Sequence, residues 1–157
     1  MLERGKMEKL IGNLRKEKYE NRIPKLKDLL ASHNIRVSHQ RLLILDYLIM
    51  NPTHPTADTI YKDLKKIDPV ISQATVYNTL NLLVEHKLVK ELDFNMSSKR
   101  YEFKKTNHGH FICESCGEIE DLDVDNIEYP EYLKDYEIDN VEVIYRGVCP
   151  NCKNNEK

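Results

Sequence analysis

Two Cys-x-x-Cys pairs constrain this chain more than any other feature. The stretch "CESC" supplies Cys113 and Cys116, "CPNC" supplies Cys149 and Cys152, and 32 residues separate the two pairs. Four thiolates at this spacing can surround one Zn²⁺ ion, with each pair on a turn that points both sulfur atoms inward. Protein ligands then fill every position, which indicates a structural rather than a catalytic site. The alternative is a reversible dithiol switch.

The length of 157 residues fits one ordinary domain or two small ones, and a small half needs a brace such as a metal ion. No apolar run approaches the roughly 18 residues that span a bilayer. The first residues, "MLERGKMEKL", lack the apolar core of a secretory signal. We therefore expect a soluble cytoplasmic protein with no membrane partner, whose reduced cysteines bind zinc.

Charge is divided unequally along the chain. Residues 1–105 carry 20 Lys and Arg against 13 Asp and Glu, whereas residues 106–157 carry 4 against 13. A basic first half attracts the phosphates of nucleic acid, and an acidic second half is repelled by them. The alternative is that the basic excess is merely solvated lysine.

Residues 22–104 have the pattern of a winged helix-turn-helix domain. Apolar residues recur at helical spacing from Ile23 onward, and Ser38, Thr56 and Ser72 each stand where an N-cap would begin a helix. The runs "LVKEL" and "RYEFK" then flank the turn-prone "NMSSK", which predicts a hairpin, or wing. Residues 1–21 are expected to form a charged N-terminal extension, to which no role is assigned.

The last helix of this half is predicted to contact DNA. Its outward side chains are amides, hydroxyls and a phenol, which suit groove edges and phosphates. Two basic residues of the wing stand where they can meet a phosphate. The predicted contacts are Gln73, Thr75, Tyr77, Asn78 and Asn81 in the helix, and Lys99 and Arg100 in the wing. The alternative is a winged helix that binds protein.

The second half reads as a small α/β unit. Three strand-like runs, "GHFIC", "EIEDLDV" and "YEIDNVEVIYRGVC", flank a short helix near "NIEYPEYLKDY". Residues 105–110 are expected to be a hinge, and residues 111–157 a zinc-containing domain. The predicted fold class is α+β.

A second metal centre is indicated by His108 and His110, which share one face of a strand. Since sulfur already satisfies the neighbouring zinc, these imidazoles imply another ion. Glu102 and Asp121 can supply oxygen to it, and the loop residue His54 can supply nitrogen. Such a mixed set suits Mn²⁺ or Fe²⁺ at least as well as zinc. Loop histidines are common, so spacing alone leaves this site open.

These residues together resemble the ferric uptake regulator family of metal-dependent bacterial repressors. The resemblance covers about residues 22–153 and is carried by a series of stretches found in order: "VSHQRLLILDYL", "HPTADTIY", "SQATVYNTL", "LVKEL", "RYEF", "HGHFICESCGEIEDL" and "GVCPNC". It implies a homodimer with an N-terminal winged helix and a C-terminal α/β dimerisation domain.

The resemblance also implies site residues and a DNA partner. It places structural Zn²⁺ on the four cysteines and a regulatory Fe²⁺ or Mn²⁺ on His54, Glu102, His108, His110 and Asp121. The partner is then a double-stranded operator with adjacent half-sites, expected as an inverted repeat. The family's members are repressors, so no enzyme activity is expected.

Three positions bear on the branch of the family. Asn78 and Asp121 look like those of peroxide-sensing repressors, whereas Glu102 points away from them. In that branch, iron at the regulatory site reacts with hydrogen peroxide and a ligand histidine is oxidised; the matching positions are His54 and His108. Iron-uptake and zinc-uptake regulators share the scaffold and are the alternative.

Functions from other classes of protein account for fewer of these residues. A zinc deaminase needs an H-x-E motif, and none occurs in the chain. A transcription-complex adaptor built from a winged helix and a zinc ribbon, or a redox chaperone that releases zinc, would leave His54, His108 and His110 without a role.

Overall fold

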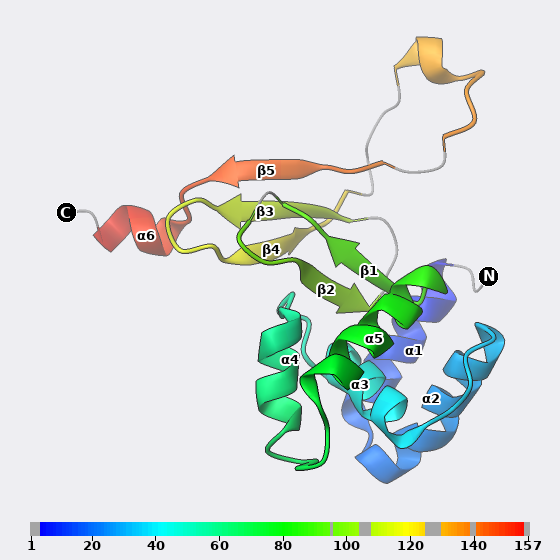
Figure 1. Cartoon of the computed structure of the whole chain (residues 1–157). Coiled ribbons are helices and arrows are strands. Elements are labelled where there is room, and N and C mark those ends of the chain that lie inside the picture. Colours follow the sequence, from blue (N-terminus) through cyan, green and yellow to red (C-terminus); the bar gives the residue numbers. More distant parts are fainter. Residues whose placement is uncertain (1–3, 95, 104–107, 125–129, 139–140, 156–157) are drawn as a thin grey trace. The chain divides into compact units, whose positions relative to one another are not determined.

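The chain forms two compact units that divide between residues 104 and 105. A computed structural model describes residues 4–94, 96–103, 108–124, 130–138 and 141–155 (Figure 1). Unit 1 consists of α1 (Arg4–Lys16), α2 (Tyr19–Ser32), α3 (His39–Met50), α4 (Ala57–Leu64), α5 (Gln73–Glu85), β1 (Val89–Leu92) and β2 (Arg100–Phe103). Unit 2 consists of β3 (Gly109–Cys113), β4 (Ile119–Leu122), the 3₁₀ helix η1 (Glu131–Leu133), β5 (Ile144–Gly147) and α6 (Pro150–Asn155). This confirms the predicted α+β class. Of the hinge expected at residues 105–110, residues 105–107 lie outside the described residues, and Gly109 and His110 are part of β3.

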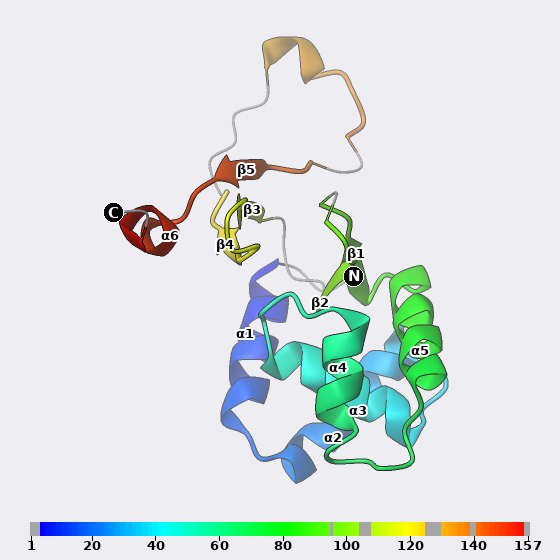
Figure 2. The same cartoon turned by 60° about the vertical axis from the view of Figure 1, so that its left-hand side comes forward.

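Helix α3 lies at the centre of unit 1, where it packs against α1, α2, α4, α5 and β2 (Figure 2). Its sequence is apolar almost all round, as a helix buried on every side requires. The buried side chains are Leu42, Leu43, Ile44, Leu45, Leu48 and Ile49. Each contributes about 1.5–3 kcal/mol relative to an exposed position. None of the described helices is both long and apolar enough to cross a membrane.

Three hydroxyl caps begin helices α3, α4 and α5, as the sequence predicts. Ser38 accepts a hydrogen bond from the Arg41 N–H at 3.3 Å at the start of α3. Thr56 accepts one from the Thr59 N–H at 3.1 Å at the start of α4. Ser72 accepts from the Thr75 N–H at 3.0 Å and so sets the first residue of α5. Each cap satisfies one of the backbone donors that a helix start leaves open.

Helix α1, in the predicted N-terminal extension, belongs to the core of unit 1. Ile11 and Leu14 are buried in the same hydrophobic cluster as α3. Arg15 Nε also donates to the carbonyl of Ile49 at 2.8 Å, which ties α1 to the end of α3. The short apolar series of this helix was visible in the sequence, but what it packs against was not.

A charged pair joins α2 to α3. The Arg22 guanidinium donates two hydrogen bonds to the Asp46 carboxylate, at 2.6 and 2.9 Å, and a third to the Glu17 carbonyl. Arg22 and Asp46 are only 9% and 13% exposed, so the two bonds offset the cost of removing both charges from water. The carboxylate raises the pKa of Arg22.

The wing is an antiparallel hairpin whose second strand faces the core. β1 pairs with β2 so that Val89 lies opposite Phe103 and Lys90 lies opposite Glu102. Tyr101 and Phe103 are buried, and the Tyr101 N–H donates to the Pro55 carbonyl at 3.0 Å. Strand β2 is thus bound both to β1 and to the loop between α3 and α4.

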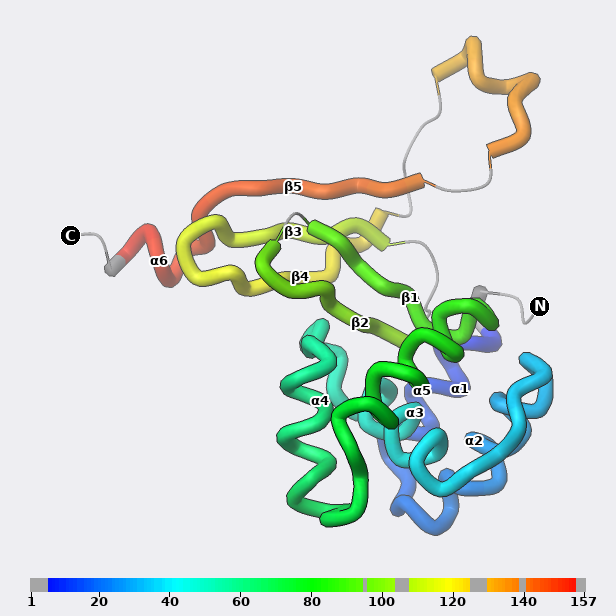
Figure 3. The backbone as a smooth tube through the Cα atoms, viewed as in Figure 1, coloured from blue at the N-terminus to red at the C-terminus, as the bar shows by residue number. Residues whose placement is uncertain are grey.

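Unit 2 is built on a three-stranded sheet in the order β4-β3-β5. β3 is antiparallel to β4 and parallel to β5, which runs alongside it (Figure 3). The first residue of β3 is Gly109, and a larger residue would not fit there, because a Cβ atom would lie 2.9 Å from the Val124 side chain and 3.0 Å from the Val143 carbonyl oxygen. Each strand-like run of this half contains a strand: "GHFIC" is β3 in full, whereas β4 and β5 are shorter than the runs that predicted them. The helix expected near "NIEYPEYLKDY" appears, within the described residues, only as η1.

Two substitutions in α1 test whether this helix belongs to the cooperative core. Leu14→Ala should lower the free energy of unfolding by about 3 kcal/mol, because a fully buried side chain is removed. Gly12→Ala should raise it by about 0.5–1 kcal/mol, since the added methyl group meets nothing within 4 Å. Urea unfolding followed by circular dichroism measures both. If α1 were frayed, neither change would alter the transition.

Candidate metal centres and DNA interface

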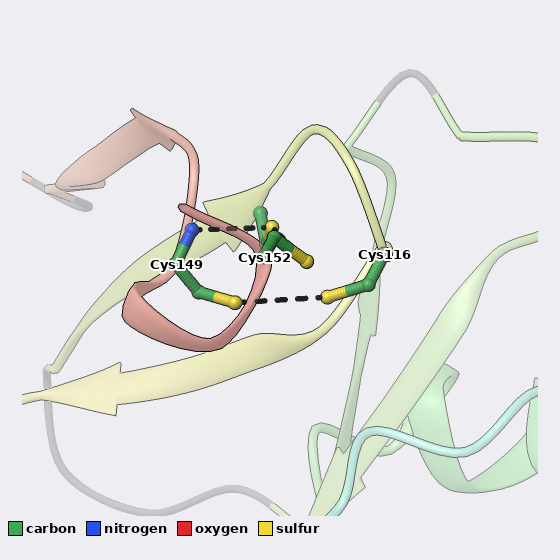
Figure 4. Close-up of side chains that lie close together, drawn as sticks. Cys116, Cys149 and Cys152 are labelled. Atoms are coloured by element: carbon green, nitrogen blue, oxygen red, sulfur yellow. Dashed lines mark hydrogen bonds between the residues drawn. The ribbon is translucent and has the colours of Figure 1, made fainter. Parts of the chain in front are cut away.

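Four thiols from three segments of unit 2 converge on one point. Cys113 ends β3, Cys116 follows in the next turn, Cys149 precedes α6 and Cys152 lies within α6. The Sγ atoms of Cys113 and Cys152 are 3.9 Å apart, as are those of Cys116 and Cys149 (Figure 4). All four sulfur atoms lie within 4.8 Å of one another. These distances are about twice the length of a disulfide bond, so the thiols are free.

The geometry of this cluster fits a zinc ion. Four sulfur atoms at about 2.3 Å from a tetrahedral centre lie about 3.8 Å from one another, close to the 3.9 Å observed. Gly117, with a φ of 73°, closes the turn after Cys116, and its N–H donates to the Cys113 carbonyl at 2.8 Å. The backbone therefore holds the first pair in place. With four protein ligands, the site has no open position for a substrate.

The electrostatics of the cluster point to the same need for a cation. The backbone N–H of Cys149 donates to Cys113 Sγ at 3.3 Å and lowers the pKa of that thiol to about 6. The adjacent Cys149 thiol raises the pKa of Cys152 to about 12. Four thiolates so close together repel one another, and a divalent ion removes that repulsion.

In unit 1, His54 and Glu102 form a buried pair, called here the loop pair. His54 Nε2 lies 3.3 Å from Glu102 Oε2, and the two side chains are 3% and 4% exposed. His54 lies in the loop before α4 and has a φ of 51°, a conformation that costs a residue other than glycine about 1–3 kcal/mol. The fold holds this conformation in spite of its cost.

Strand β2 holds the loop pair through three successive residues. Arg100 Nη1 donates to the His54 carbonyl at 3.3 Å, and the next residue, Tyr101, donates its N–H to the Pro55 carbonyl. Glu102 then presents its carboxylate to the His54 ring. Arg100, predicted from the sequence to meet a DNA phosphate, is thus bonded to this loop. The phosphate contact itself stays a prediction.

In unit 2, His108, His110 and Asp121 form a second group, called here the sheet triad. The β3–β4 register places His110 opposite Asp121. Asp121 Oδ1 lies 3.4 Å from His108 Nε2 and 3.7 Å from His110 Nε2, and the two imidazole rings meet edge to face with centroids 4.6 Å apart. The two-residue spacing of the histidines thus brings both to one carboxylate, as the sequence led us to expect.

Both groups have distances that suit metal ligands. Two ligands bound to one ion at about 2.1 Å lie about 3.0–3.5 Å apart. The His54–Glu102 and His108–Asp121 distances, 3.3 and 3.4 Å, lie in this range, and the His110–Asp121 distance of 3.7 Å is slightly longer. Imidazole and carboxylate donors suit Mn²⁺, Fe²⁺ and Zn²⁺. The donor chemistry of each group therefore fits a divalent ion. It differs from that of the thiol cluster, which favours zinc.

Helices α4 and α5 form a helix-turn-helix whose second helix presents polar side chains to solvent. Gln73, Tyr77, Asn78 and Asn81 are exposed, and Thr75 is half-buried. Lys99, in the wing, is exposed and forms an ion pair with Glu91 at 2.6 Å, which raises the pKa of the lysine. Exposed pairs of this kind are weak, so Lys99 remains able to meet a phosphate.

The structure also places near the predicted DNA contacts some polar residues that the sequence did not single out, among them Gln40, Arg41 and Asp58. An open polar hollow of about 240 Å³ lies between the start of α3 and α5, lined by Ser38, Gln40, Arg41, Thr75, Asn78 and Thr79. On α4, Asp58 accepts a hydrogen bond from Gln73 at 2.8 Å. An acidic residue in the first turn of a helix is usually explained by the helix dipole, which is why Asp58 drew no attention in the sequence.

Comparison with known proteins decides the family. The profile of the ferric uptake regulator family matches residues 32–152. The chain belongs to the ferric uptake regulator family. It is 40% identical over 128 residues to the peroxide-responsive repressor PerR of Staphylococcus aureus strain Mu50, an alignment that covers 79% of this chain and 86% of the relative. The PerR of Staphylococcus epidermidis is 39% identical, with 79% and 85% covered.

Solved structures agree with this assignment. The ferric uptake regulator of Vibrio cholerae is similar with a TM-score of 0.67 and 28% identity, covering 78% of this chain and 98% of that one. The regulator of Helicobacter pylori has the same fold, with a TM-score of 0.66 and 23% identity over 87% of this chain and 95% of that one. Members of the family are metal-responsive transcriptional repressors that bind DNA operators as dimers and are not enzymes. The predictions of a DNA-binding repressor and of no enzyme activity are thereby confirmed.

Loss of one thiol should empty the sulfur cluster. Cys149→Ser should reduce bound zinc from about one ion per chain to near zero, because three thiolates no longer close the tetrahedron. Mass spectrometry of the metal content of the purified chain measures this. Ser115→Ala, in the exposed turn between Cys113 and Cys116, is the matched control and should keep its zinc. Full zinc in Cys149→Ser would contradict a four-thiol site.

Proposed function

We propose that this chain is a repressor that senses hydrogen peroxide through iron-catalysed oxidation of His54 or His108 at a regulatory metal site. The observation that carries this proposal is the presence of a preformed histidine–carboxylate group in each unit, the loop pair and the sheet triad. The repressor acts as a homodimer on a double-stranded operator with an inverted repeat. It works in the cytoplasm, where its operator lies.

The proposed metals follow from the donor sets. The loop pair and the sheet triad together offer three imidazoles and two carboxylates, a set that suits Fe²⁺ or Mn²⁺. The thiol cluster holds a separate structural Zn²⁺, on Cys113, Cys116, Cys149 and Cys152. The stretch "HGHFICESCG" therefore serves two ions, through its histidines and through its cysteines.

A shared regulatory ion would couple metal binding to DNA binding. The loop pair belongs to the unit that carries α5, and the sheet triad belongs to the other unit. An ion held by both groups restricts how the two units are oriented. It thereby selects the dimer whose two α5 helices match adjacent half-sites. The size of the effect is set by how much more tightly the ion binds that state.

Oxidation of a ligand would reverse this coupling. Held by the loop pair and the sheet triad, Fe²⁺ would supply one-electron chemistry toward hydrogen peroxide beside the ligand imidazoles, and would regain its electron from the imidazole that is oxidised. In the overall reaction one peroxide oxygen is added to an imidazole carbon of His54 or His108, and the other leaves as water. An oxidised imidazole is a poorer ligand, so the ion is lost and the operator is released.

Several residues support the peroxide branch. The relatives that are about 40% identical are peroxide-responsive repressors. Asn78 and Asp121 carry the side chains that are typical of that branch. The loop pair and the sheet triad also hold His54 and His108 beside a carboxylate, where oxidation of either ring changes a metal ligand.

A regulator of metal uptake is the second candidate, and Glu102 favours it. Peroxide sensors commonly have Asp at this position, one methylene shorter. The Glu102 carboxylate already lies 3.3 Å from His54 Nε2. In this reading the same site reports the supply of iron or zinc and no histidine is oxidised.

Peptide masses distinguish the two candidates. The chain is loaded anaerobically with Fe²⁺, exposed briefly to hydrogen peroxide and digested, and the masses of its peptides are measured by mass spectrometry. One added oxygen is expected on the peptides that contain His54 or His108, with the cysteines unchanged. His33, His39 and His86 serve as internal controls, and Mn²⁺-loaded protein should gain no oxygen. An unmodified His54 and His108 would reject peroxide sensing and leave the metal-uptake reading.

A substitution tests the regulatory site itself. His108→Ala should lose the Mn²⁺-dependent increase in operator affinity, expected to be about 10–100-fold, because the sheet triad keeps only one imidazole. His33→Ala, at the end of α2, is the control and should keep the full increase. Fluorescence anisotropy with and without Mn²⁺ measures both. Unchanged metal dependence in His108→Ala would remove this residue from the site.

A further inference from the structure

Asp58 is an acidic residue placed against the DNA-reading helix. Its Oδ1 accepts a hydrogen bond from Gln73 Nε2 at 2.8 Å and lies 3.5 Å from the Tyr77 hydroxyl. Gln73 is the first residue of α5 and Tyr77 lies one turn later, so both are on the same face. One carboxylate on α4 thus contacts two of the side chains predicted to touch DNA.

Attraction to DNA gives no reason for a carboxylate here. A negative charge next to a DNA-binding face repels phosphates and weakens binding to every sequence. Asp58 is exposed, and within the described part of the chain it has no Lys, Arg or His at ion-pair distance. A favourable interaction with the start of α4 explains an acidic residue in that turn, but not its bond to α5.

The chemistry of the Gln73 amide gives a reason. An amide has one carbonyl oxygen, which accepts, and one NH₂ group, which donates twice, whereas a carboxylate only accepts. The Gln73 NH₂ must therefore face Asp58, because a reversed amide would set its oxygen against the carboxylate. One N–H and the carbonyl oxygen remain, side by side, for another partner. This donor–acceptor pair matches adenine, which offers an acceptor at N7 and a donor at N6. Guanine offers two acceptors and does not match.

We propose that Asp58 is a positioning residue for DNA readout, which fixes the Gln73 amide so that α5 selects adenine over guanine at one base pair of each half-site. The inference rests on the proposed function, because it requires that α5 reads an operator. Asp58 acts through Gln73 and forms no bond to the base.

The test begins with the Mn²⁺-loaded full-length chain and a pool of random DNA duplexes, from which bound sequences are selected. Duplexes that differ from the selected operator at single base pairs are then titrated with wild type and variants. Asp58→Asn keeps the size of the side chain but can either accept from or donate to the Gln73 amide, so the orientation is no longer fixed. Glu85→Gln removes one negative charge at the exposed end of α5 and is the matched charge control.

Wild type should prefer adenine over guanine by about tenfold at one position of each half-site. Asp58→Asn should reduce that preference to about twofold and leave the other positions unchanged, whereas Glu85→Gln should keep it. Gln73→Ala should lose the preference at the same base pair, and adding Asp58→Asn to Gln73→Ala should have no further effect at that base pair. Circular dichroism and zinc content confirm that each variant is folded.

Each contrary result has its own meaning. If wild type selects no sequence, the repressor function fails before Asp58 is tested. If wild type selects an operator and Asp58→Asn keeps the adenine preference, the positioning role is wrong. An equal loss of affinity for every duplex, or effects of Asp58→Asn and Gln73→Ala at different base pairs, would also overturn it, since both indicate a general structural role.

Discussion

The structure of unit 2 depends on the cluster of four cysteine sulfur atoms, which lie within 4.8 Å of one another. Among its described residues, the buried apolar side chains are Ile112, Cys113 and Cys149, far fewer than a core of its own would need. The cluster joins the end of β3, the turn after it and α6. A tetrahedral ion supplies the stabilisation that the missing core does not, and β3, which carries His110, is set in place by it.

The same unit exposes apolar surface that a monomer has no reason to keep. The side chains concerned are Tyr132, Tyr136, Ile138, Ile144, Tyr145 and Val148. Such patches mark surfaces that bind another protein, and the family acts as dimers. Burial of this surface against a second copy would add apolar contacts to the few that unit 2 makes by itself. The acidic excess of residues 106–157 suits a part that stays away from DNA.

Unit 1, in contrast, has a large apolar core, and this core supports the strained loop of His54. Helix α3 is buried on all sides, and strand β2 rests on it through Tyr101 and Phe103. Strand β2 donates two hydrogen bonds to the loop of His54, and its Glu102 carboxylate lies beside the His54 ring. Because β2 is also half of the wing, the loop pair and the predicted DNA contacts of the wing involve the same strand. The core therefore both stabilises the unit and links its two candidate sites.

The sequence by itself determined the helix starts at Ser38, Thr56 and Ser72, the pairing of His108 with His110 and the two cysteine pairs, because each depends on spacing and local hydrogen bonds. It left undecided the role of α1, whose few apolar residues gain meaning only from the α3 surface that buries them. The partners of Arg100 and Asp58 were likewise hidden, since they lie 46 and 15 residues away along the chain. Only the tertiary structure brings such groups within hydrogen-bond distance, because contacts of this kind depend on how helices and strands pack rather than on the order of residues.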